Sequence, residues 1–220
     1  MIRFLIRFSH LLAATLLYAV GIVITLRANV GYVPWDVFHA GLAQTVGISF
    51  GVATIVVGAV IVAFVAVCGE KIGIGTIISM TLTGIFIDLI MMIEIIPLAP
   101  NMAIGTAMLV SGLLVVSIAT YFYIRSAFGA GPRDNLMVVL TRKTKIPVGV
   151  CRSIVELAVT LAGWLLGGMV GIGTLISVIA VGFCIQLVFK IFRFNVAAVK
   201  HETLKQTYKT LVTALRDSKK

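Results

Sequence analysis

The sequence predicts an all-α polytopic membrane protein with six transmembrane helices, and three features predict it: composition, charge-free runs and an internal duplication. Of the 220 residues, 60% are hydrophobic and 12% are charged. Soluble domains are about half apolar and about a quarter charged. Residues 50–69, 95–124 and 157–189 carry no charge, and about twenty apolar residues suffice for a helix to cross a bilayer. The chain is therefore expected to be embedded in lipid.

The two halves of the chain align without a gap when the sequence is shifted by 98 positions. The shift superposes "GEKIGIGTIIS", from Gly69, on "GGMVGIGTLIS", from Gly167, with identity at seven of eleven positions. It also superposes Arg27 on Arg125, Gly31 on Gly129, Pro34 on Pro132 and Asp36 on Asp134. Chance matches in apolar sequence favour Leu, Val and Ile, whereas Gly, Pro, Asp and Arg carry this alignment. The pattern indicates two structural repeats.

Each half contains three long apolar segments, which we expect to be the transmembrane helices. They cover residues 9–27, 50–69 and 73–94 in the first half, and 104–126, 149–168 and 171–192 in the second. A shorter segment follows the first span of each half, at 34–46 and 132–145, and is too short to cross the hydrocarbon as a helix. The predicted domains are a first repeat over 1–98, a second over 99–195 and a tail over 196–220.

The distribution of Lys and Arg favours six crossings over eight. With six, the loop 95–103, which lacks Lys and Arg, faces outward, and the basic segment 125–149 faces the cytoplasm together with both termini. This is the arrangement that the positive-inside rule favours. With eight crossings, Arg125 and Arg133 would face outward. Three spans per repeat also mean that the two repeats insert with opposite orientations.

Both short segments begin with the pattern Gly-x-x-Pro-x-Asp. Proline suits the first turn of a helix, aspartate there faces the positive end of the helix dipole, and glycine lets the chain turn sharply after the preceding span. Inverted repeats with short helices whose N-termini approach the midplane are typical of secondary transporters. Asp36 and Asp134 therefore either line a polar pathway or simply cap helices that lie in the interface, and the sequence leaves both open.

Ionisable residues in membrane regions are costly and need partners, so they are the candidate pathway residues. Arg152 and Glu156 are spaced i, i+4 and can pair on one helix face, either as a structural lock or as part of a binding site. Asp88 lies near the predicted outer end of its span, where solvation of the helix end is an alternative to function. The predicted substrate or ion pathway residues are Arg27, Trp35, Asp36, Asp88, Arg125, Arg133, Asp134, Arg152 and Glu156.

The two halves differ at the short segments, where Trp35 corresponds to Arg133 and His39 to Met137, so we expect an asymmetric site. A Gly-x-Gly-Thr motif opens the third span of each half. These motifs serve either close helix packing through small residues or a close approach of the backbone to substrate. The predicted turn and backbone residues are Gly31, Pro34, Gly73, Gly75, Gly129, Pro132, Gly171 and Gly173.

The tail from Arg193 is basic and amphipathic. Apolar residues recur at helical spacing between lysines and arginines, which predicts a helix that lies against anionic lipid headgroups. A net charge of +10 also suits nucleic-acid binding. However, a cytoplasmic excess of Lys and Arg already follows from the topology, so no nucleic-acid partner is expected.

The sequence shows no catalytic or metal-binding pattern. Its three histidines lie far apart, its three cysteines have no metal-type spacing, and a glycine-rich nucleotide loop is missing. We therefore expect neither an enzyme, nor a cofactor, nor a bound metal.

Four motifs together resemble the YczE/YitT family of bacterial membrane proteins: Gly-x-x-Pro-x-Asp, "GIS-x-G" at Gly47–Gly51, Gly-x-Gly-Thr and "IDL" at Ile87–Leu89. The likeness covers nearly the whole chain up to the tail. It implies a six-helix protein of the bacterial cytoplasmic membrane and brings no settled activity. The inverted repeat favours a secondary transporter of an unidentified small molecule. The small number of intramembrane charges favours a non-transporting accessory protein that supports biosynthesis or secretion. Homodimers are common in small transporters, but the sequence carries no interface signature.

Cysteine accessibility tests the predicted orientation of the two short segments. In a background whose native cysteines are replaced, single cysteines are introduced over 32–46 and 130–144 and treated with a membrane-impermeant thiol reagent from each side. We expect residues near Asp36 to react only from outside and those near Asp134 only from inside, because the repeats insert oppositely. Reaction of both segments from the same side would contradict the six-crossing topology.

Overall fold

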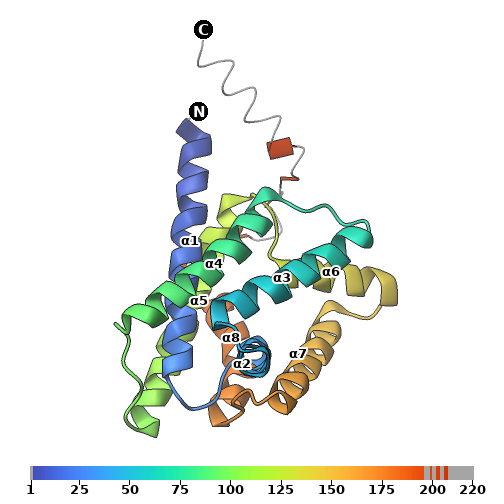
Figure 1. Cartoon of the computed structure of the whole chain (residues 1–220). Helices are drawn as coiled ribbons and strands as arrows, with labels where there is room; N and C mark the ends of the chain where they lie inside the picture. The colour runs from blue at the N-terminus through green and yellow to red at the C-terminus, as the bar shows by residue number, and fades with distance from the viewer. Residues whose placement is uncertain (1, 196–198, 200–201, 204–205, 208–220) are drawn as a thin grey trace.

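The computed structural model describes residues 2–195, 199, 202–203 and 206–207. Over these residues it contains eight α-helices (Figure 1). They are α1 Ile2–Arg27, α2 Pro34–Val46, α3 Phe50–Val67, α4 Ile74–Ile93, α5 Met102–Ser126, α6 Pro132–Thr144, α7 Val148–Leu165 and α8 Ile172–Ile191.

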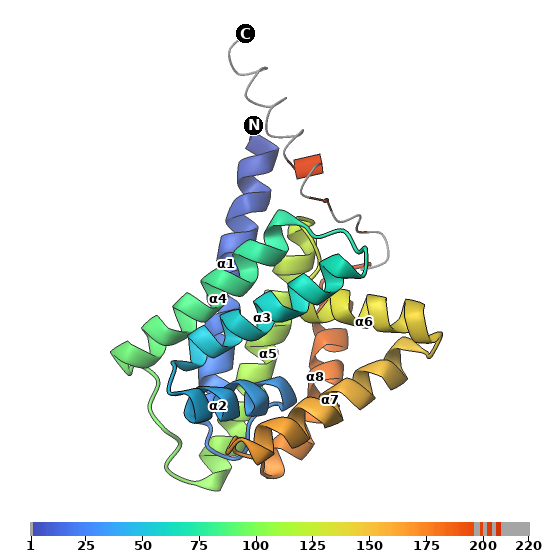
Figure 2. The ribbon, with the colours of Figure 1, turned by 45° about the vertical axis from the view of Figure 1, so that its right-hand side comes forward.

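The prediction of an all-α polytopic membrane protein is confirmed. In the described part of the chain, α1, α3, α4, α5, α7 and α8 are long and apolar enough to cross a membrane. The other two helices, α2 and α6, have 13 residues each and begin with the predicted prolines. The N-terminal end of α1 extends beyond the other helices in both ribbon views (Figures 1 and 2).

α1 and α5 form the centre of the molecule, with α4 packed against α1 and α8 against α5 (Figure 2). Small residues bring the central pair together. A Cβ added to Gly21 would lie 2.9 Å from the backbone nitrogen of Val116, and one added to Gly112 would lie 3.0 Å from the carbonyl oxygen of Gly21. Close approach through glycine is favourable here because lipid offers no hydrophobic driving force between transmembrane helices.

Each short helix packs against a long helix of the other half: α2 lies beside α7, and α6 lies beside α3. Gly41 of α2 faces the carbonyl oxygen of Gly163 in α7. On the other side, Val139 of α6 packs with Val65 of α3 in one buried cluster. The two halves are thus interlocked through their short helices.

The turns before the short helices are held by backbone hydrogen bonds that recur 98 positions apart in the sequence. The N–H of Gly173 donates to the carbonyl of Val30 at 2.7 Å, and the N–H of Gly75 donates to the carbonyl of Phe128 at 2.9 Å. Each Gly-x-Gly-Thr motif therefore supplies a donor to the turn that follows the first span of the other half.

Glycine is required in these turns. Gly31 and Gly129 have positive φ angles of +113° and +138°, a conformation that side chains rarely adopt. A Cβ on Gly31 would lie 2.6 Å from the backbone nitrogen of Gly171, and one on Gly129 would lie 2.8 Å from the Cα of Gly73. Of the two interpretations of the Gly-x-Gly-Thr motifs, close packing is the one that these contacts support.

The two halves differ in how their second and third spans meet. Gly51 of α3 faces the carbonyl oxygen of Gly84 in α4, so these helices touch through their backbones. The equivalent residues are Gly149 of α7 and Gly182 of α8, and no described atom of another helix lies within 4 Å of a Cβ added to either. α3 and α4 are therefore closed against each other at a position where α7 and α8 are apart.

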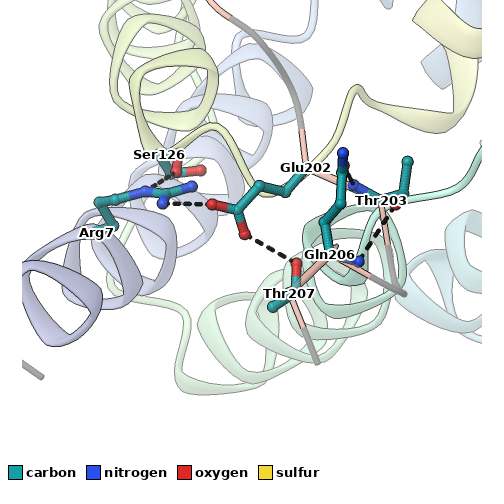
Figure 3. Close-up of polar contacts among 6 residues, drawn as sticks. All are labelled: Arg7, Ser126, Glu202, Thr203, Gln206 and Thr207. Carbon is teal, nitrogen blue, oxygen red and sulfur yellow. Dashed lines mark hydrogen bonds and ion pairs between the residues drawn. The ribbon is translucent and has the colours of Figure 1, made fainter. Parts of the chain in front are cut away.

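Described residues of the tail are bound to the ends of α1 and α5 (Figure 3). Arg7 forms an ion pair with Glu202 at 2.6 Å and donates to the carbonyl of Ser126 at 2.9 Å. The N–H of Glu202 donates to the carbonyl of Ala127 at 2.8 Å, and the hydroxyl of Thr207 donates to the Glu202 carboxylate at 3.1 Å. The predicted amphipathic helix of the tail falls mostly on residues outside those that the structure describes.

Replacing Gly84 by Ala tests the closed packing of α3 on α4. The added methyl group meets the carbonyl oxygen of Gly51 and the side chain of Ile55, so we expect a loss of about 1–3 kcal/mol in unfolding free energy. The matched control is Gly182→Ala, whose methyl group enters open space and gains up to about 1 kcal/mol in helix propensity. Thermal unfolding of both purified variants in detergent measures the difference. Equal midpoints would contradict the described packing.

Candidate functional site

Two cavities, each about 130 Å³, lie among the helices. Cavity 1 is lined mainly by α1, α3, α4 and the start of α6, and cavity 2 by α1, α5, α7, α8 and the start of α2. Tyr18, Ile22, Arg133 and Asp134 line both cavities and form a wall between them. Each cavity has room for several water molecules.

The two cavities are lined by equivalent positions of the two halves. Thirteen lining residues of cavity 1 have their counterparts in cavity 2 after the shift of 98 positions. Among them, Thr54, Gly58, Ser79, Met80 and Thr83 correspond to Arg152, Glu156, Ser177, Val178 and Val181. The placement is shared but the chemistry is not, because an ion pair in cavity 2 takes the place of small uncharged residues in cavity 1.

The first turns of α2 and α6, which begin at Pro34 and Pro132, meet between the cavities. The guanidinium of Arg133 lies 4.8 Å from the centre of the Trp35 ring, in a cation–π contact. Its Nη2 atom lies 4.0 Å from Oδ1 of Asp36. Trp35 and Arg133 occupy equivalent positions of the two halves, so the two helix starts face each other.

Cavity 2 collects charges of both signs in a largely apolar lining. Asp36 is buried and faces Arg133, and Arg152 pairs with Glu156 at 2.8 Å. Charged groups are tolerated within a membrane protein when they pair in this way. The structure thus brings these predicted pathway residues to one cavity: Trp35, Asp36, Arg133, Asp134, Arg152 and Glu156.

His39 lies beside this group but lines cavity 1. Its side chain is 2% exposed, and its Nδ1 lies 3.6 Å from Oδ1 of Asp36, which is longer than a direct hydrogen bond. His39 belongs to α2, outside the six candidate spans. Burial lowers the pKa of its imidazole below the ordinary value, so the neutral form is favoured at neutral pH.

The other predicted pathway residues, Arg27, Arg125 and Asp88, are not among the described residues that line either cavity. Arg27 faces Glu94 at 3.8 Å, and Arg125 donates to the hydroxyl of Tyr121 at 2.7 Å. Asp88 accepts hydrogen bonds from the start of α3. It therefore holds the beginning of a neighbouring helix, a contact that the sequence did not reveal.

Several polar residues of the spans line the cavities without having been predicted. Tyr18 lines both cavities, Tyr123 lines cavity 1 and Thr25 lines cavity 2. Ser79 and Ser177 line one cavity each at equivalent positions. A single uncharged polar residue in an apolar span is a weak signal, and only the recurrence of Ser79 as Ser177 could have singled out a pair.

The helices and paired cavities define a multi-pass, all-α membrane protein with a charged site between its two halves. Among the described residues, no three His, Cys, Asp or Glu side chains lie close enough to hold a metal ion. The chain belongs to the family described as "Family of unknown function (DUF6198)", whose model matches residues 5–190. The predicted resemblance to YczE-like membrane proteins is confirmed.

The relatives of the chain are bacterial. It is 31% identical to the "Uncharacterized membrane protein YczE" of Bacillus subtilis over 186 residues, and this alignment covers 82% of the chain and 84% of the relative. It is 29% identical to an "Uncharacterized protein" of Haemophilus influenzae over 83% of each chain. It is 24% identical to the "Uncharacterized protein YyaS" of Bacillus subtilis, over 78% of this chain and 87% of the relative. No solved structure matches the chain.

Removing the cation of Arg133 tests its role beside Asp36. Because Arg133→Met leaves a buried carboxylate without this cation, we expect a loss of about 1–3 kcal/mol in unfolding free energy, measured by denaturant unfolding in detergent micelles. Adding Asp36→Asn should recover most of the loss, because substitutions at residues in contact do not have additive effects on the unfolding free energy. The control is Arg152→Met, whose partner is Glu156 on its own helix, and Asp36→Asn should not rescue it. Additive effects of Arg133→Met and Asp36→Asn would contradict the pairing.

Proposed function

We propose that this chain is a secondary transporter of the bacterial cytoplasmic membrane, built from two inverted repeats with both termini in the cytoplasm. One observation carries the proposal: equivalent positions of the two halves line two cavities that share a wall, formed by Tyr18, Ile22, Arg133 and Asp134. In transporters with inverted repeats, the substrate site lies at the repeat interface near the midplane, where short helices point their N-termini at the substrate.

Alternating access follows when the two halves exchange conformations. In this mechanism, the pair α3–α4 and the equivalent pair α7–α8 are in different states. The first pair is closed through Gly51 and Gly84, and the second is open at Gly149 and Gly182. In the opposite state, α7 closes on α8 while α3 opens from α4. The glycines that the second closure needs are already present in the sequence, which supports a protein with two conformations.

Cavity 2 is the proposed substrate site because it holds charges of both signs. Arg133 and Arg152 suit an anionic group, and Asp134 and Glu156 suit a cationic one. The apolar remainder of the lining suits a small organic molecule. An ion gradient is the proposed source of energy, since the sequence has no nucleotide-binding loop, and transport rather than enzymatic turnover is the proposed activity.

A non-transporting accessory protein that supports biosynthesis or secretion is the alternative function, and the low charge content of the spans favours it. Three further partners stay predictions: anionic headgroups at the tail, a second copy of the chain in a homodimer, and the unidentified small molecule itself. No nucleic-acid partner is proposed.

Exchange by the purified protein in liposomes tests transport before the substrate is known. Proteoliposomes are loaded with a low-molecular-mass extract of bacterial cells and diluted into the same extract labelled with radiocarbon. We expect the wild type to take up label by exchange. We expect Arg133→Gln to lower the rate about ten-fold or more, because the variant lacks a charge that lines the cavity and faces the substrate. Arg125→Gln, which changes the same residue type away from the cavities, is the matched control.

Uptake by the wild type that is no faster than uptake by protein-free liposomes would contradict the transport proposal and favour the accessory function. Equal loss of exchange in Arg133→Gln and Arg125→Gln would show that the effect does not arise in the cavities.

A further inference from the structure

We infer that His39 and Asp36 form a proton relay that couples substrate movement to the proton gradient. The inference rests on the proposed transport function and deepens it by naming the coupling ion. The two residues lie one turn apart on α2 but line different cavities: His39 lines cavity 1, whereas Asp36 lines cavity 2. A proton passed between them moves from one cavity to the other while the shared wall stays closed.

The imidazole and the carboxylate are positioned for such a transfer. Nδ1 of His39 lies 3.6 Å from Oδ1 of Asp36, and their side chains are only 2% and 5% exposed. Within the described part of the chain, Nδ1 has no hydrogen-bond partner, an arrangement that is unfavourable for a buried polar atom. A small side-chain movement brings the two atoms within hydrogen-bonding distance.

The charged and titratable groups around His39 come from several helices. They are Asp36 on α2, Arg133 and Asp134 on α6, Tyr18 on α1 and Tyr123 on α5, with Arg152 and Glu156 of α7 beyond Asp36 in cavity 2. On the α3 side, the Phe50 ring meets the imidazole edge-on at 5.8 Å and keeps that side apolar. Asp36 and Arg133 have opposite effects on protonation of the imidazole. The carboxylate of Asp36 stabilises the imidazolium form, whereas the guanidinium of Arg133 destabilises it.

The transfer is balanced in protons. His39 accepts one proton from solvent in cavity 1 and becomes an imidazolium. Its Nδ1 then donates a proton to Oδ1 of Asp36, which restores the neutral imidazole and leaves a protonated carboxyl group. That proton leaves Asp36 into cavity 2. Imidazole suits this role because one ring nitrogen can accept a proton while the other releases one near neutral pH.

Arg133 links the relay to the substrate. Its guanidinium lies 4.0 Å from Oδ1 of Asp36, and a cation beside a carboxylate favours the charged form. An anionic group of the substrate that draws Arg133 away makes protonation of Asp36 easier. Substrate binding and proton binding then favour each other, and this mutual preference is a coupling free energy.

Comparing exchange with gradient-driven accumulation isolates this coupling. Proteoliposomes with wild type or variant receive the radiocarbon-labelled extract under two conditions: exchange at equal pH on both sides, and accumulation driven by an imposed pH gradient. The test variants are His39→Gln and His39→Met, the second of which carries the residue found at the equivalent position, Met137. The matched control is His10→Gln, since His10 packs near Phe122 and is not among the described residues that line the cavities.

We expect gradient-driven accumulation to fall about ten-fold in both His39 variants, a loss within the range of typical coupling free energies. Exchange moves no net proton, so it should continue at a measurable rate in the same variants. Asp36→Asn should also lose accumulation, and His10→Gln should accumulate label like the wild type.

Accumulation by the His39 variants at the wild-type level would overturn the relay. A wild type that exchanges label but does not accumulate it under an imposed pH gradient would overturn it as well. Loss of exchange as well as accumulation, in variants that keep the wild-type unfolding temperature, would also overturn it, because His39 would then belong to the substrate site. Absence of any exchange by the wild type would instead remove the transport function itself, so the two failures are distinguishable.

Discussion

The structure depends on the reciprocal hydrogen bonds between the turns of one half and the glycine motifs of the other. In lipid, every backbone polar group needs a partner within the protein, and the turns after α1 and α5 interrupt helical hydrogen bonding. The carbonyls of Val30 and Phe128 find donors in the N–H groups of Gly173 and Gly75. Glycine leaves room for these contacts, where a side chain would collide with backbone. The contacts hold the two halves together at the turns that lead into α2 and α6.

The meeting of the two helix starts explains where the protein keeps its charges. The start of α6 lines a cavity otherwise formed mainly by the first half, and the start of α2 lines one formed mainly by the second. Arg133 therefore reaches both Trp35 and Asp36. An isolated charge in the hydrocarbon would be costly, whereas a charge that pairs with one of opposite sign inside the protein is tolerated. A chain with so few ionisable residues can retain them here.

The two halves share one architecture and carry different chemistry. Thr54 and Gly58 leave cavity 1 uncharged at the positions where Arg152 and Glu156 place an ion pair in cavity 2. His39 adds an imidazole to the first half only. Helix packing differs as well, because α3 is closed on α4 where α7 is apart from α8. The proposed transport mechanism uses this difference between the halves, since inverted-repeat transporters alternate between states.

The sequence by itself determined the fold class, the number of candidate spans and the starts of the short helices. These depend on local chemistry: apolar length, the first-turn preference of proline, and the cost of charge in lipid, which also identified Asp36, Arg133 and their neighbours in cavity 2. Only the tertiary structure decided which ionisable residues share a cavity. It placed Arg27 and Asp88 elsewhere and brought Tyr18 into both cavities. The distance between residues on separate helices is a product of helix packing, and no local property of the chain encodes it.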